Sequence, residues 1–123
     1  MDTSFARTWL RLEGAAVLLA AVAAYHAGGL RWSVFALLFL VPDLSLLGYL
    51  AGPRTGALAY NLAHSYVAPL LLGALGLAGG PNLLVGYALI WCAHVGFDRA
   101  LGYGLKSPAG FRLTHLGLIG RER

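Results

Sequence analysis

His94 and Asp98 stand four residues apart in the apolar stretch that reads WCAHVGFDRALGYGLK, residues 91–106. In a helix this spacing places both side chains on one face, one turn apart. An imidazole and a carboxylate arranged in this way can bind a divalent metal, share a proton or tie two helices together. Because an ionisable group at membrane depth is costly, the pair is treated as functional by default if the stretch spans a bilayer.

Two further polar residues lie inside other apolar runs: Asp43 and His64. Counting about 1.5 Å of helical rise per residue from the ends of these runs places both at the depth of His94 and Asp98. Two imidazoles and two carboxylates are a suitable ligand set for zinc or another divalent transition metal. The sequence therefore predicts a divalent metal site formed by these four residues, with zinc as the first choice.

Other polar residues are expected around this site. Asn61 and Ser65 fall within one turn of His64, and Glu13 opens the first apolar run. These three are expected to orient the ligands or a bound water. A substrate phosphate or a lipid headgroup is the expected contact of three residues near the end of the last run: Arg99, Tyr103 and Lys106. The alternative for this last group is an interface aromatic with two side chains that snorkel to the headgroups.

The composition is that of a membrane protein. Of the 123 residues, 59% are hydrophobic and 11% are charged, against about 45–50% and about 25% in soluble domains. Spans of about 20 apolar residues are expected at residues 8–27, 32–50, 56–78 and 83–105. The predicted fold is a single all-α domain over residues 1–123, an integral membrane four-helix bundle. Residues 106–123 are expected to form a short basic tail, amphipathic or irregular, on the membrane surface.

Two prolines are expected to kink the bundle. A proline inside a helix removes a backbone hydrogen bond and clashes with the carbonyl four residues earlier. Pro42 predicts a kink near Leu38 in the second span, and Pro69 predicts one near Ser65 in the third.

Basic residues give the orientation. Seven of them are expected on one side of the membrane: Arg7, Arg11, Arg54, Lys106, Arg112, Arg121 and Arg123. Arg31 alone is expected on the other side. The excess of Lys and Arg marks the cytoplasmic side, so both termini are expected in the cytoplasm. The net charge of +4 then reflects orientation and headgroup contacts, so the expected partners are membrane lipids and further copies of the chain, with no nucleic acid.

Most of the chain, from about Leu10 to Gly120, resembles a family of small bacterial four-span membrane proteins of unknown function. The resemblance is carried by three stretches: ALLFLVPDLSLLGYLAGPRTGALAYNLAHSYVAPLLL, IWCAHVGFDRALGYGLKSP and GFRLTHLGLIG. It implies the four-span topology and a multi-pass location in the bacterial inner membrane.

A shorter pattern resembles an inner-membrane family of metal-dependent hydrolases. The pattern is Pro-Asp, then His-Ser, then His-xxx-Asp, at Pro42–Asp43, His64–Ser65 and His94–Asp98. That family has an additional His-Arg pair shortly before its His-Ser, where this chain reads YNLAHS with Asn61. The resemblance implies hydrolysis at a metal site formed by these residues.

Several functions stay open at this stage, and whether the protein is an enzyme is one of the open points. The first hypothesis is a metal-dependent hydrolase acting on a lipid-derived or phosphorylated substrate. A second is a proton-linked small transporter or channel, since chains of buried Asp and His suit proton relays. A third is haem bound between His64 and His94. The fourth is a non-catalytic accessory subunit in which the polar residues serve only to pack the helices.

Overall fold

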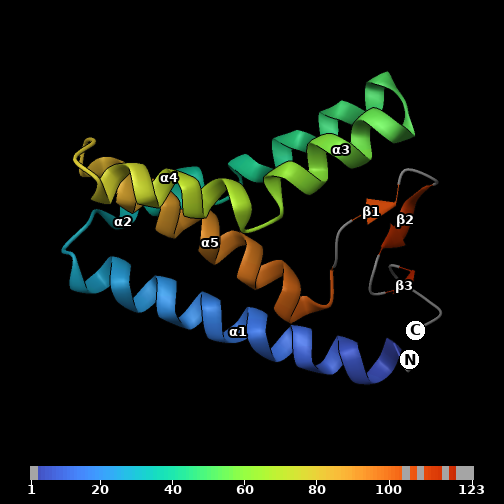
Figure 1. The fold of residues 1–123 in the computed structure, drawn as a ribbon, viewed down its shortest axis with the longest axis horizontal. Coiled ribbons are helices and arrows are strands. Elements are labelled where there is room, and N and C mark those ends of the chain that lie inside the picture. Colours follow the sequence, from blue (N-terminus) through green and yellow to red (C-terminus); the bar gives the residue numbers. More distant parts are fainter. Residues whose placement is uncertain (1–2, 104–105, 108–109, 115–116, 119–123) are drawn as a thin grey trace.

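The chain passes back and forth four times as helix (Figure 1), which confirms the predicted all-α bundle. The computed structural model describes residues 3–103, 106–107, 110–114 and 117–118. The first pass is α1 (Thr3–Ala27) and the last is α5 (Leu83–Leu101). The two middle passes are broken, the second into α2 (Trp32–Leu38) and η1 (Val41–Ala51), the third into α3 (Pro53–Ala63) and α4 (Val67–Leu77).

Three of the four passes are long and apolar enough to cross a membrane: Ser4–Ala27, Trp32–Ala51 and Pro53–Leu77. Their outward faces carry large exposed hydrophobic side chains such as Leu19, Leu37 and Leu77. Helix α5 is the most enclosed of the helices, and it holds polar residues that are buried against the other passes. The fold therefore turns an apolar surface outward and buries two charged side chains, Asp98 and Arg99, on α5.

Helices α1 and α5 pack closely because two glycines meet at their contact. A Cβ atom added to Gly96 would lie 2.6 Å from the Gly14 carbonyl oxygen and 2.9 Å from the Leu18 nitrogen. Small residues allow such close approach of helix backbones. Helix α5 is thereby fixed against α1 along one face, and its opposite face is left for the two broken passes.

Both predicted kinks are confirmed, and each is a complete interruption of the helix. The second pass breaks between Leu38 and Val41, and Pro42 stands in the first turn of the segment that follows. That segment, η1, is a 3₁₀ helix over all of its 11 residues. Such runs rarely exceed 3–4 residues and are typical of hinges and strained sequences. The third pass breaks between Ala63 and Val67, two residues before Pro69.

The end of the chain differs from the sequence-based expectation. Helix α5 ends at Leu101, where Gly102 takes the left-handed conformation with φ of 97°, and residues 104–105 of the expected span lie outside the described residues. The described part of the tail forms an antiparallel sheet of β1 (Lys106–Ser107), β2 (Gly110–Thr114) and β3 (Gly117–Leu118), in the order β1-β2-β3. This corrects the expected amphipathic or irregular segment. The alternation of apolar and polar residues in GFRLT has the period of a strand.

Candidate metal site

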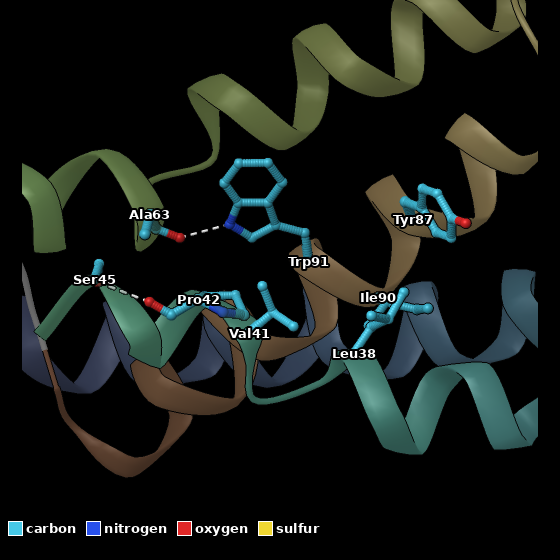
Figure 2. A pocket seen from close by; sticks show the side chains of 8 residues that line it. All are labelled: Leu38, Val41, Pro42, Ser45, Ala63, Tyr87, Ile90 and Trp91. Carbon is cyan, nitrogen blue, oxygen red and sulfur yellow. Dashed lines mark hydrogen bonds between the residues drawn. The ribbon is translucent and has the colours of Figure 1, made fainter. Parts of the chain in front are cut away.

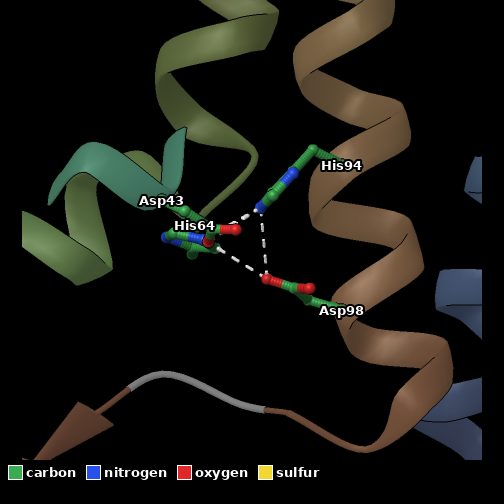
Figure 3. Close-up of side chains that lie close together, drawn as sticks. All are labelled: Asp43, His64, His94 and Asp98. Carbon is green, nitrogen blue, oxygen red and sulfur yellow. Dashed lines mark hydrogen bonds and ion pairs between the residues drawn. The ribbon is translucent and has the colours of Figure 1, made fainter. Parts of the chain in front are cut away.

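Four side chains from three passes converge on one point (Figure 3). His64 Nε2 lies 3.0 Å from Asp43 Oδ1, 3.1 Å from His94 Nε2 and 3.3 Å from Asp98 Oδ2. His94 Nε2 lies 3.2 Å from Asp43 Oδ1 and 3.4 Å from Asp98 Oδ2. All four donor atoms lie within 4.8 Å of one another. The structure thus brings together the four residues that the sequence predicts as metal ligands.

Each broken pass supplies one of these residues at its break. Asp43 is in the first turn of η1, directly after the gap that follows α2. His64 is the residue that caps the C-terminal end of α3. Helix α5 supplies the other two one turn apart. In membrane proteins broken helices often border a binding site, because irregular backbone is tolerated where it lines a site or is buried in protein.

Two side chains of α5 satisfy the backbone at the break in the third pass. The indole N–H of Trp91 donates to the carbonyl of Ala63. The Arg99 guanidinium donates from Nη2 to the His64 carbonyl at 2.8 Å and from Nη1 to the Tyr103 carbonyl at 3.3 Å. Buried carbonyls need such partners. The helix that carries His94 and Asp98 therefore also holds the backbone that carries His64.

His64 is held with its Nε2 lone pair facing the cluster. Its Nδ1–H donates to the Tyr60 carbonyl at 3.0 Å, which leaves Nε2 unprotonated in the neutral imidazole. The Tyr60 ring stacks on the His64 ring, with centroids 3.8 Å apart and planes 7° apart. A backbone carbonyl that accepts the second ring N–H is the usual way in which a metal-binding histidine is oriented.

The charges of the cluster call for a cation. With both imidazoles neutral, the two carboxylates give a formal charge of −2. The two Nε2 atoms are only 3.1 Å apart, so they cannot both carry protons that point at each other, and at most one N–H can separate them. Of the two carboxylates only Asp98 is buried, and an uncompensated buried charge is strongly destabilising. A divalent ion would balance the charge and accept all four lone pairs.

Asp43 is the accessible member of the cluster. Its side chain is 42% exposed, whereas that of His64 is 0% exposed and that of Asp98 is 12% exposed. His94 is buried, and its Nδ1 has no hydrogen-bond partner among the described residues. A ligand from outside would therefore approach from the side of Asp43.

The remaining predicted site residues are spread more widely. Asn61 and Ser65 are half-buried on either side of His64, and Glu13 is exposed on α1. Arg99 is buried and directs both hydrogen bonds to backbone carbonyls. Tyr103 is half-buried just beyond α5, and Lys106 lies in β1.

Three aromatic neighbours of the site are absent from the predicted set: Phe39, Tyr60 and Trp91. Phe39 packs on His94, with ring centroids 5.1 Å apart. Tyr60 precedes His64 by four residues and Trp91 precedes His94 by three, so helical spacing already placed both beside a histidine. No helical spacing indicated Phe39, because Phe39 and His94 are distant in sequence and meet only in the tertiary structure.

Comparison with known proteins gives a family and no activity. No curated protein and no solved structure matches the chain. Residues 7–119 match a family described as a domain of unknown function. Since this match covers nearly the whole chain, the protein belongs to that family, the domain of unknown function DUF4260.

Proposed function

We propose that this protein is a metal-dependent hydrolase of the bacterial inner membrane, acting on a lipid-derived or phosphorylated substrate. One divalent ion, with zinc as first choice, would be bound by Asp43, His64, His94 and Asp98. The observation that carries the proposal is the convergence of four donor atoms from three passes at separations of 3.0 to 3.4 Å among the pairs that include a histidine.

The separations fit a small tetrahedral ion. Bonds of about 2.0–2.1 Å to a central zinc place neighbouring ligand atoms about 3.3–3.4 Å apart. Two imidazoles on opposite faces of a haem would instead stand about 4 Å apart, at twice a metal–nitrogen bond of about 2.0 Å. The 3.1 Å between the Nε2 atoms of His64 and His94 therefore favours a small ion over haem.

The accessible carboxylate supports a hydrolytic role. A bound divalent ion can lower the pKa of water to about 7 and polarise a phosphoryl or carbonyl oxygen. Catalytic zinc sites keep one position open, whereas structural sites are closed by four protein ligands. Asp43, on the exposed side and at a helix break, is the ligand that can yield its position. The three buried residues would then hold the ion in place.

The test is metal content, measured by mass spectrometry on detergent-purified protein. The wild type is expected to hold near-stoichiometric metal, and a His64→Ala/His94→Ala double variant that is still helical is expected to hold none. His26→Ala is the matched control, because His26 is exposed at the far end of α1. No metal in the wild type after loading with zinc, manganese and iron would overturn the proposal.

A second variant separates a hydrolytic site from a structural one. Asp43→Ala is expected to keep metal, because three donors remain. It is expected to lose phosphate release from phosphatidic acid in detergent micelles, because the carboxylate that yields its position would otherwise accept a proton from the attacking water. If wild-type protein loaded with metal releases no phosphate or fatty acid from a panel of lipid esters, the site is structural and the hydrolase proposal fails.

A proton-linked transporter is the alternative that one observation favours. The contact of 3.1 Å between the two Nε2 atoms would be bridged by a single proton in a protein without metal. Proton flux into liposomes that is abolished by Asp43→Asn, together with absence of metal, would support this alternative.

A further inference from the structure

The helices enclose an apolar cavity of about 490 Å³, whose lining residues are drawn in Figure 2. Its lining comes from α2, η1, α3 and α5: Leu38, Val41, Pro42, Ser45, Ala63, Tyr87, Ile90 and Trp91. The volume falls within the range of about 300–1,000 Å³ that is usual for small-molecule pockets. None of the four cluster residues lines the cavity, so it is a separate site.

The cavity and the cluster share a wall. Pro42 directly precedes Asp43, and Ala63 directly precedes His64. On α5 the positions 87, 90 and 91 that line the cavity continue into positions 94 and 98 of the cluster. These spacings of three and four residues follow one face of a helix. The face is apolar over the first turns and polar over the last turns.

The walls offer few polar atoms to an occupant, and one of them, the Tyr87 hydroxyl, belongs to an exposed side chain. The Trp91 indole N–H is already bonded to the Ala63 carbonyl, and the Ser45 hydroxyl donates to the Pro42 carbonyl at 2.7 Å. Figure 2 shows both bonds within the wall itself. Among the lining residues Val41 and Tyr87 are exposed, so the cavity is open to the surroundings of the helices. An occupant with hydrogen-bonding groups along its length would leave them unpaired, which is costly.

We infer that this cavity binds one hydrocarbon chain of an anionic phospholipid whose phosphate faces the Asp43–Asp98 cluster. The second and third passes, which supply α2, η1 and α3 of the lining, are apolar enough to lie in a bilayer, where lipid chains are the abundant apolar species. The headgroup phosphate would bind the divalent ion at the coordination position that Asp43 yields, and this part of the inference rests on the proposed function. The accessible side of Asp43 provides the junction between chain and headgroup.

Photolabelling of the full-length protein tests the chain site. The probe is phosphatidylglycerol with a diazirine near the end of one acyl chain, in vesicles of phosphatidylethanolamine and phosphatidylglycerol. Labels in the wild type are expected to concentrate on residues 38–45 and 87–91. Ser45→Phe, which fills the cavity, is expected to lower this labelling several-fold. Leu44→Phe is the matched control, since Leu44 is exposed and outside the lining.

Leu38→Trp is a second cavity-filling variant, and Leu37→Trp is its control, because only Leu38 of the two lines the cavity. Helix content by circular dichroism is measured on every variant. The inference is overturned if labels on residues 38–45 and 87–91 are no denser than on exposed positions of α1, or if a filling variant that is folded labels like its control. A protein without metal that still labels in the cavity would refute the proposed function and leave the chain site standing.

Discussion

At the residue scale, His64 has the most demanding position in the protein. Its Nδ1–H and its backbone N–H both donate to the Tyr60 carbonyl, its own carbonyl accepts from Arg99, and its Nε2 faces three donor atoms. Every polar atom of His64 therefore points toward a specific partner. Such orientation holds a metal ligand in place before the ion arrives, which reduces the cost of binding.

We predict that the affinity for zinc falls as the pH is lowered from about 7.5 to about 5.5, because protons compete with the metal for imidazole nitrogens. Only the neutral imidazole ring has a lone pair to donate to the metal, so acid favours the metal-free protein. Competition with a coloured zinc chelator at a series of pH values measures the effect. Asp43→Asn should keep the same pH dependence, whereas an affinity that does not change with pH would contradict binding through histidine.

At the scale of elements, the two helix breaks and α5 form one unit. Each break places a ligand, and α5 supplies both the remaining ligands and the donors for the carbonyls at the α3–α4 break. A proline interrupts the helix in each middle pass. Side chains from α5 donate hydrogen bonds to the carbonyls that the α3–α4 break leaves unpaired, as an apolar environment requires. The site thus depends on the position of α5 against the third pass.

Trp91→Phe keeps an aromatic ring in the wall and removes the N–H donor to the Ala63 carbonyl. We predict a loss of about 1 kcal/mol in the free energy of unfolding, between the ~0.6 kcal/mol average for side-chain bonds in membranes and the larger cost of an unpaired buried carbonyl. Metal affinity should also fall, because Ala63 adjoins His64. Denaturation in detergent micelles and metal titration measure the two effects.

Trp9→Phe is the control for this change, since Trp9 is exposed on α1. Equal stability of the wild type and Trp91→Phe would show that the indole N–H does not hold the break. A loss of stability with unchanged metal affinity would show that the break and the site are independent.

At the scale of the whole molecule, the four passes separate the basic residues. The start of α1, the turn between η1 and α3, and the strands after α5 lie at one end of the bundle (Figure 1), and the α1–α2 and α4–α5 turns lie at the other. Arg7, Arg11 and Arg54 are thereby at the first end, and Arg31 is at the second. This arrangement is typical of a protein whose first end is cytoplasmic.

We predict the corresponding pattern of cysteine labelling. In a Cys92→Ala background, Asn82→Cys should react with a membrane-impermeant maleimide in intact spheroplasts, because it lies in the α4–α5 turn. Thr55→Cys, at the start of α3, should react only after permeabilisation. Both positions are exposed, so a difference in labelling would report the side of the membrane and not burial of the side chain. The reverse pattern would mean that the bundle is inverted and that the cluster faces the other side.

Composition and periodicity alone determined the helical bundle, its four passes, its two proline breaks and which four polar residues lie close together. Apolar runs of bilayer length need no tertiary information. Rise per residue placed Asp43, His64, His94 and Asp98 at one depth, because depth in a bundle is set by position along each helix. The strands after α5 were missed, although GFRLT carries the alternation that indicates one.

Only the tertiary structure decided which way the side chains turn and what surrounds them. The depth of a residue along a helix does not say which way its side chain points around the helix axis. The breaks after Leu38 and Ala63 change that direction in both middle passes. The contact of Arg99 with the His64 carbonyl, the packing of Phe39 on His94 and the cavity beside the cluster all depend on it. They arise from contacts between residues distant in sequence, which no local pattern records.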